Sequence, residues 1–230
     1  MRLSVTTLKQ VAVVAMVADH ASMLFMEPSP LKIGVMTAGK TAAPIMFFLL
    51  AQGYRHTGDL GKYMKRLLVA AFISQIPYSL FTIKGANMPL CANVMFTLSL
   101  SLTALYVQDK EKNRVIRWSV IFFIIIVSYF ADWGVFGPLI TLSFRVSRSR
   151  SGQIAAYLIT SVVKAAVMYV YIGRVPELYA YMISPIAVSL LLAFYSDKKG
   201  SCRYRWAFYA IYPLQFICIY GLWRITRGGL

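Results

Sequence analysis

Long apolar runs separated by short polar stretches extend through the whole chain. Most runs are about 20 residues long, which is the length an α-helix needs to cross the hydrocarbon core of a membrane. Apolar runs bounded by charges predict membrane helices near residues 8–26, 33–54, 67–83, 90–107, 115–131, 133–146, 154–172, 177–195 and 206–224. The pattern therefore predicts an all-α, polytopic integral membrane bundle of about eight to nine transmembrane helices.

The segment 133–146 is the least regular of these elements. It is too short to cross a membrane unaided, and only Asp132, Trp133 and Gly134 separate it from the helix before it. Non-helical backbone is tolerated at membrane depth only where it is buried in protein or lines a cavity. We therefore expect either a ninth, short helix or a re-entrant half span at this place.

Composition agrees with a membrane protein of one domain. Of the 230 residues 59% are hydrophobic and 14% are charged, whereas a soluble domain carries about a quarter charged residues. These values exclude a soluble enzyme, a disordered chain and a disulfide scaffold. The cysteines lack the spacing of a metal site. No repeat or linker divides the chain, so residues 1–230 are expected to form a single domain.

The formal charge of +16 is concentrated in alternate loops. The loops after the second, fourth, sixth and eighth predicted helices hold fifteen basic residues, and the loops after the first, third, fifth and seventh hold three. The fifteen are Arg55, Lys62, Lys65, Arg66, Lys110, Lys112, Arg114, Arg117, Arg145, Arg148, Arg150, Lys198, Lys199, Arg203 and Arg205. By the positive-inside rule the N-terminus is cytoplasmic, and the expected partner of these charges is membrane lipid rather than nucleic acid.

The first predicted helix contains the densest group of ionisable residues. Asp19 and His20 lie deep in an apolar run, and Lys9 lies near its start. Eleven residues of helix bring Lys9 and His20 onto one face, about 16 Å apart along the axis. In one interpretation His20 is a general base whose tautomer Asp19 holds, and in the other the two residues join helices structurally. Asp19 is expected to pair with Lys40 or Lys164.

Basic residues at the second helix give two further candidates. Lys40 lies inside this helix and either binds an anionic ligand or extends its ammonium to the outer interface. At the cytoplasmic end of the second helix and the start of the third, four residues are predicted either to clamp phosphate groups or to face lipid headgroups. These residues are Arg55, His56, Lys62 and Arg66.

Polar side chains in the later helices have two possible roles. They either line a cavity or form hydrogen bonds between helices. The candidates are Gln75, Asn93, Thr97, Tyr209, Tyr212 and Gln215. No sequence motif for ATP binding, dinucleotide binding, zinc hydrolysis or a serine nucleophile is present.

An ordered set of short motifs resembles the TraX family over nearly the whole chain. The motifs are Lys9, Met16 and Asp19-His20; Gly39-Lys40 with Pro44; Gly53-Tyr54-Arg55-His56-Thr57; Lys62-Tyr63 and Arg66-Leu67-Leu68; Ser74-Gln75-Ile76-Pro77-Tyr78; Asn93 with Phe96-Thr97-Leu98; and Tyr212-Pro213-Leu214. The family takes its name from membrane proteins that acetylate the N-terminus of conjugative pilin. It is similar to the acyltransferase-3 group, whose first helix carries a basic residue, ten intervening positions and a His, as Lys9 and His20 do here.

The resemblance implies a bacterial inner-membrane acetyltransferase. Acetyl-CoA is then the donor, the basic residues meet its phosphates, and the acceptor is a protein or glycan of the cell envelope. Two positions depart from the family pattern: Lys40 replaces the usual Arg, and Gln215 replaces the usual His. Because Gln cannot act as a base, the base is placed at His20.

Two functions are therefore predicted. In the first, acetyl-CoA binds at the basic end and its thioester reaches His20, which activates an acceptor amine or hydroxyl. In the second, the chain is a transporter or flippase in which Asp19, His20 and Lys164 relay protons or hold an anion. Neither function requires a metal or a redox cofactor.

Overall fold

The computed structural model describes residues 3–172, 178–196 and 205–227. These residues form an all-helical bundle without strands, apart from two isolated backbone bridges. The elements are α1 (Val5–Phe25), α2 (Pro30–Gly39), α3 (Ala42–His56), α4 (Leu60–Ser79), the π-helical turn η1 (Leu80–Gly85), α5 (Val94–Lys110), α6 (Arg114–Ser128), α7 (Phe136–Val146), α8 (Arg150–Ile172), α9 (Leu178–Ala193) and α10 (Arg205–Arg227). Every predicted segment overlaps one or two of these elements, which confirms the helical membrane bundle.

Two predicted helices are interrupted. Residues 33–54 divide into α2 and α3 at Lys40 and Thr41, where the Thr41 hydroxyl donates a hydrogen bond to the carbonyl of Ala38 over 2.6 Å. Such a side-chain bond competes with the helical ladder and bends the chain. The third predicted helix continues from α4 into η1 after Pro77, whose missing N–H disturbs regular α-helical bonding.

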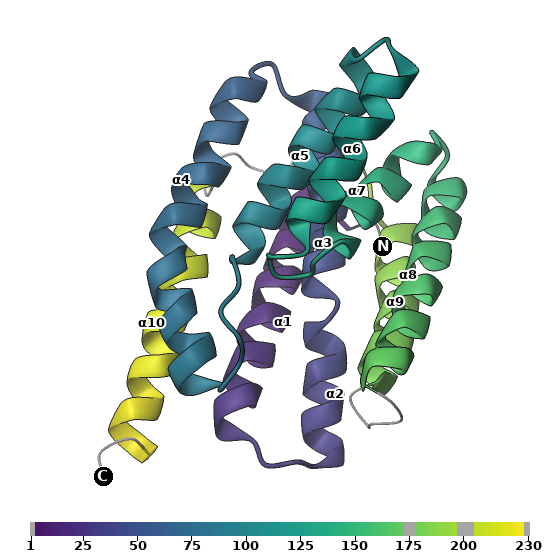
Figure 1. The fold of residues 1–230 in the computed structure, drawn as a ribbon. Coiled ribbons are helices and arrows are strands. Elements are labelled where there is room, and N and C mark those ends of the chain that lie inside the picture. The colour runs from purple at the N-terminus through teal and green to yellow at the C-terminus, as the bar shows by residue number, and fades with distance from the viewer. Residues whose placement is uncertain (1–2, 173–177, 197–204, 228–230) are drawn as a thin grey trace.

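Helix α7 begins inside the bundle rather than at its surface (Figure 1). It has 11 residues, which extend about 16 Å, or half of a hydrocarbon core about 30 Å thick. The chain reverses between α6 and α7, and this turn pairs with the chain before α5: Ala92 receives a backbone bond from Asp132 and donates one to Phe130. The structure thus favours the re-entrant alternative for residues 133–146.

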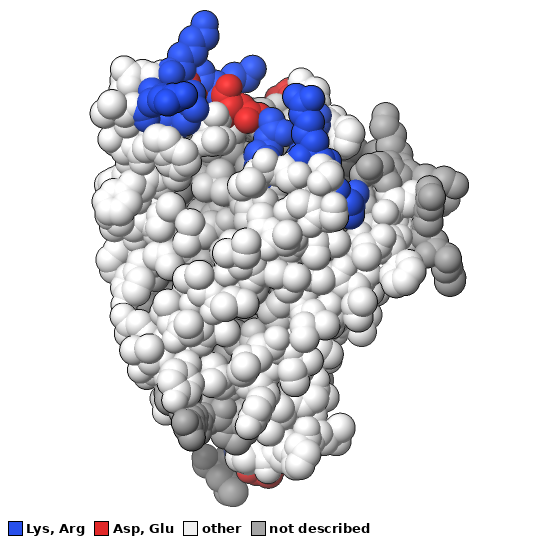
Figure 2. All heavy atoms as spheres, turned by 90° about the vertical axis from the view of Figure 1, so that its right-hand side faces the viewer, with Lys and Arg blue, Asp and Glu red and all other residues white. Residues whose placement is uncertain are grey.

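Basic residues gather at one end of the molecule. The ends of α3, α5 and α7 and the starts of α4, α6 and α8 lie together at the top of Figure 1, and Figure 2 shows Lys and Arg side chains at this end above an almost uncharged face. The α1–α2 connection and the C-terminal end of α10 lie at the other end, where Arg227 approaches Glu27 at 3.6 Å. Arg174, Lys198, Lys199 and Arg203 lie outside the described residues.

The exterior of the bundle is apolar, as lipid contact requires. Side chains such as Ile76, Phe122 and Val162 are exposed, and aromatic residues including Phe48, Phe144 and Tyr157 fill the interior. Among the described residues, four helical stretches are long and apolar enough to cross a membrane: Val5–Phe25, Pro30–His56, Leu60–Gly85 and Arg150–Tyr171. The remaining helices are shorter or less apolar and pack around the breaks described above.

Candidate functional site

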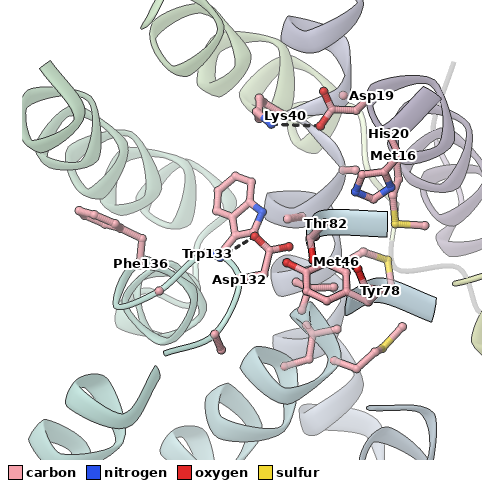
Figure 3. A pocket seen from close by; sticks show the side chains of 18 of the residues that line it. Met16, Asp19, His20, Lys40, Met46, Tyr78, Thr82, Asp132, Trp133 and Phe136 are labelled. Atoms are coloured by element: carbon pink, nitrogen blue, oxygen red, sulfur yellow. Dashed lines mark hydrogen bonds and ion pairs between the residues drawn. The ribbon is translucent and has the colours of Figure 1, made fainter. Parts of the chain in front are cut away.

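A cavity of about 760 Å³ lies inside the bundle. Its wall includes residues of α1, α3, α5, α8, α9 and α10 and the turn between α6 and α7. Along α1 it extends from Ala12 to Met23, which spans about 16 Å of helix axis. Figure 3 shows that charged and aromatic side chains from several elements point into it, among them His20, Asp132 and Trp133.

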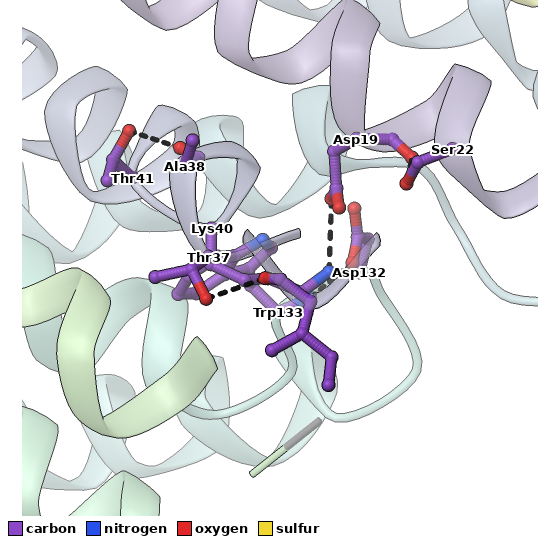
Figure 4. A network of polar contacts seen from close by, with 9 residues as sticks. Asp19, Ser22, Thr37, Ala38, Lys40, Thr41, Asp132 and Trp133 are labelled. Carbon is purple, nitrogen blue, oxygen red and sulfur yellow. Dashed lines mark hydrogen bonds and ion pairs between the residues drawn. The ribbon is translucent and has the colours of Figure 1, made fainter. Parts of the chain in front are cut away.

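An ion pair between Asp19 and Lys40 forms one wall of the cavity. The Lys40 ammonium lies 3.0 Å from Oδ2 of Asp19, and both side chains are largely buried (Figure 4). Of the two partners predicted for Asp19, the structure therefore shows Lys40, whose ammonium does not extend to the outer interface. Gly39 makes this contact possible because a Cβ there would overlap the Asp19 side chain.

His20 projects into the same cavity. Its ring packs against Phe81 and Phe216, with centroids 5.4 and 4.8 Å away, and its Nδ1 is buried without a hydrogen bond. Gln215 lies within interaction distance of the imidazole, yet neither oxygen nor nitrogen of its buried amide makes a hydrogen bond. An imidazole with a free nitrogen in a cavity can take up or release a proton there.

The turn between α6 and α7 brings two further residues to the cavity. Asp132 accepts a hydrogen bond from the Trp133 amide over 2.9 Å, and its carboxylate lies in the electrostatic field of His20 and Lys40. Trp133 has a φ of 68°, a left-handed conformation that is rare for a bulky side chain. Sequence analysis missed Asp132 as a site residue because it stands between two apolar runs and resembles a loop residue.

Lys164 reaches the cavity from α8. Its ammonium lies 3.2 Å from the centroid of the Trp133 ring and 5.1 Å from that of Tyr181. The cavity wall therefore carries two carboxylates, two ammonium groups and one imidazole, contributed by α1, the α2–α3 junction, the α6–α7 turn and α8. Such a set can bind polar groups and transfer protons at membrane depth.

Three of the six later polar candidates bond between helices instead of lining the cavity. Gln75 of α4 accepts from Asn93 and donates to the carbonyl of Cys91, and Asn93 also donates to the carbonyl of Ala71. Thr97 donates to the carbonyl of Asp132 and so holds the α6–α7 turn. These bonds pair backbone N–H and C=O groups before α5 and α7 that have no hydrogen-bond partner within a helix.

The C-terminal helix contributes the other candidates. Tyr212 lines the cavity and accepts a hydrogen bond from the Val94 amide over 3.3 Å. Tyr209 is half-buried one turn earlier, and Gln215 is buried beside His20. Of the six residues predicted as cavity lining or interhelical, Tyr212 is the one on the cavity wall.

The basic residues of the α3–α4 hairpin share one end of the molecule but not one site. Arg55 lines a cleft of about 770 Å³ with Lys110 and Arg145, and this cleft lies between α3, α5 and α7. His56 is exposed, and Lys62 pairs with Asp59 at 3.1 Å. Hydrogen bonds from the Lys62 backbone and side chain hold the pKa of Asp59 below its usual range, so that carboxylate stays ionised at neutral pH.

Arg66 lies on another side of the hairpin. Its guanidinium covers the Tyr63 ring at 5.7 Å, and Tyr63 interacts with Tyr209 of α10. Nearby, the ammonium of Lys9 lies 5.3 Å from the centroid of Phe208, which itself lines the cavity. The predicted four-residue clamp is therefore split, because successive positions on α3 and α4 face different neighbouring helices.

The Arg55 cleft and the cavity have no lining residue in common. In sequence, Leu102, Leu105 and Phe144 stand between the residues of α5 and α7 that line the two spaces, and they are completely buried. The cavity wall includes Ala12 and Val13 of α1 and Phe208 of α10. Lys9 contacts Phe208, and Arg66 covers Tyr63, which interacts with Tyr209, so both basic residues are linked to this part of α10.

Comparison with known proteins agrees with the sequence motifs. The TraX protein family model matches residues 4–223. A relative from Dichelobacter nodosus, named "Probable fimbrial assembly protein FimC, serogroup H1", is 29% identical over 222 residues, which are 90% of this chain and 91% of that protein. No solved structure matches the chain.

Proposed function

The chain belongs to the TraX family, and from this premise we propose that it is a membrane acetyltransferase with His20 as general base. The observation that carries the proposal is the position of His20: a half-buried imidazole on the cavity wall, whose Nδ1 is buried without a hydrogen bond. Pilin-related acceptors fit the family and the name of the Dichelobacter relative. A glycan amine or hydroxyl of the cell envelope is the other acceptor class.

We place the donor, acetyl-CoA, at the basic end. Its phosphates would meet Lys9 and Arg66, since cationic side chains bind phosphate oxygens. The flexible arm would then enter between α1 and α10 and follow α1 to His20. Lys9 and His20 are separated by about 16 Å of helix axis, a length that suits an extended cofactor arm. Arg55 is the weaker candidate for this contact, because its cleft shares no lining residue with the cavity.

The proposed transfer uses one proton carrier. His20 takes the proton from the acceptor amine or hydroxyl while the acceptor atom attacks the thioester carbonyl carbon. The C–S bond breaks, the acetyl group stays on the acceptor, and the CoA thiolate receives the proton from His20. The Lys40 ammonium supplies positive charge on the cavity wall, and its ion pair with Asp19 fixes its position.

A transporter is the alternative function. It is favoured by the charges of both signs on the cavity wall, because intramembrane ionisable residues are typical of proton and ion pathways. It predicts proton-dependent uptake into vesicles without binding of any acyl-CoA.

Binding and hydrolysis of acetyl-CoA by the purified protein in detergent test the proposal. We expect His20→Ala to abolish slow thioester cleavage while binding persists, and Arg66→Ala to weaken binding more than Arg55→Ala. Arg148→Ala, at an exposed position of the same end, is the matched control for charge. Cleavage at the wild-type rate in His20→Ala would exclude this base, and absence of acyl-CoA binding would favour transport.

A further inference from the structure

Lys164 is a nearly buried cation without an anionic partner. Its side chain is 8% exposed, it lies on the cavity wall, and among the described residues its ammonium makes no hydrogen bond or ion pair. Three aromatic rings surround the ammonium, with centroids at 3.2 Å (Trp133), 5.1 Å (Tyr181) and 5.9 Å (Phe136). Such a charge in a membrane helix requires compensation.

The neighbouring groups compensate it only in part. A desolvated cation–π contact stabilises a cation, but by less than the cost of placing a lysine near the centre of a membrane helix. The carboxylate of Asp132 interacts electrostatically with the Lys164 ammonium, but the two groups are too far apart to form an ion pair. Asp19 is already paired with Lys40, a second cation facing the same space. The Lys164 ammonium therefore retains donors that face the cavity.

The turn that places the Trp133 ring against Lys164 is held by several contacts. Trp133 and Gly134 both have positive φ values, 68° and 49°, and this conformation strains the backbone of a non-glycine residue such as Trp133. The turn keeps this conformation through its backbone bonds to Ala92 and through Phe47, whose ring meets the Trp133 indole edge-on at 5.9 Å. Strain retained at a cavity wall is typical of a ligand site.

We propose that Lys164, with Trp133 and Tyr181, binds an oxyanion group, a carboxylate or phosphate, of the molecule that accepts the acetyl group. The cavity wall includes Tyr171, in the last turn of α8, and Met88, which follows η1. Helix α8 runs from the basic end toward the opposite end of the bundle (Figure 1), and an acceptor from the envelope side would enter there. The assignment to the acceptor rests on the proposed function, whereas the anion site does not. A lysine suits both oxyanions because its ammonium acts as a compact point charge.

Fluorescence of Trp133 tests the anion site directly. In a variant with Trp133 as the sole tryptophan (Trp118→Phe, Trp206→Phe, Trp223→Phe), we expect iodide to quench emission saturably and acetate or inorganic phosphate to compete. Lys164→Met should weaken this quenching at least about tenfold, the loss expected for a charged hydrogen-bond donor, and Lys164→Arg should retain it. If iodide quenches Trp133 equally with and without the Lys164→Met substitution, in otherwise identical proteins, Lys164 does not form an anion site.

Three controls separate this result from folding and from the proposed function. Neutral acrylamide should quench the Lys164→Met protein as before, and Lys84→Met, at an exposed lysine, should leave iodide quenching unchanged. CoA should not displace iodide from the protein that retains Lys164, because the oxyanion belongs to the acceptor. Displacement of iodide by CoA would assign the anion to the donor and overturn the acceptor assignment. If the protein binds the anion but binds no acetyl-CoA, the anion site is retained and the proposed acetyltransferase function is rejected.

Discussion

At the residue scale, the Asp19–Lys40 ion pair offers the sharpest test of stability. Asp19→Asn leaves the Lys40 ammonium largely buried without a counter-charge, and breaking a buried pair in this way costs about 3–5 kcal/mol. We expect a corresponding loss in the free energy of unfolding, measured by denaturant titration in detergent micelles.

The double variant Asp19→Asn/Lys40→Met is the matched control. It removes both charges at nearly constant volume, so most of the lost stability should return. If the double variant loses as much free energy of unfolding as the two single variants together, the two side chains act independently and the ion pair does not contribute as described.

Gln215 gives a second prediction at this scale. Both polar atoms of its amide are buried without a hydrogen bond, and such groups disfavour folding. Gln215→Leu should therefore unfold with unchanged or higher free energy. If contact with the amide orients His20, acetyl-CoA hydrolysis should fall at the same time, by at least about tenfold, because a misplaced base transfers protons less efficiently. If this stable variant hydrolyses acetyl-CoA at the wild-type rate, Gln215 does not orient His20.

Single residues were predictable where their type contradicted the surrounding pattern. Asp19, His20 and Lys40 are ionisable groups inside apolar runs, and that contrast alone marks them. Asp132 lacks this contrast because it stands between two runs. Its position in the cavity depends on the turn pairing with Ala92, which is 40 residues away along the chain, and local patterns contain no information on that contact.

At the element scale, α7 packs closely against α5 through Gly137. A Cβ at this position would overlap the Thr97 side chain and approach Cζ of Phe47 at 3.2 Å. Overpacking of this kind costs about 1–3 kcal/mol, so Gly137→Ala should lower the free energy of unfolding and disturb the turn that carries Asp132 and Trp133.

Gly221 of α10 provides the matched control. No atom lies within 4 Å of a Cβ built there, and replacing a helical Gly by Ala stabilises by about 0.5–1 kcal/mol. Opposite signs for Gly137→Ala and Gly221→Ala are expected in the same unfolding assay. A stabilising effect at both positions would contradict the close packing of α5 and α7.

The helices themselves were predictable from apolar length, but their breaks were not. The division at Lys40 and Thr41 depends on the Asp19 side chain of another helix, and the start of α5 at Asn93 depends on its bonds to Gln75. These tertiary contacts decide where regular bonding stops. The segment 133–146, which contains α7, was the exception, because its length already indicated a short helix or a half span.

At the scale of the whole molecule, the distribution of charge predicted which helix ends lie together. Arg55, Lys110 and Arg145 come from three different helices and line one cleft, and Figure 2 shows basic side chains gathered at one end, as alternating loops require. The shape of the cavity could not be predicted from the sequence, because its wall combines residues from at least six elements. The separation of the Arg55 cleft from the cavity likewise depends on packing between α5 and α7.

The path of α6 and α7 leads to the last prediction. Both helices reach the basic end, so the loops before α6 and after α7 should face the same side of the membrane although two helices separate them. In a variant without cysteines, single cysteines at Lys112 and Arg148 should react with an impermeant maleimide only after lysis of bacterial spheroplasts, because basic loops stay in the cytoplasm. A cysteine at Glu27, which lies beside Arg227 at the other end, should react in intact spheroplasts. Labelling of positions 112 and 148 from opposite sides would mean that the chain crosses the membrane between them, and the turn with Asp132 would then be an exposed loop instead of part of the cavity wall.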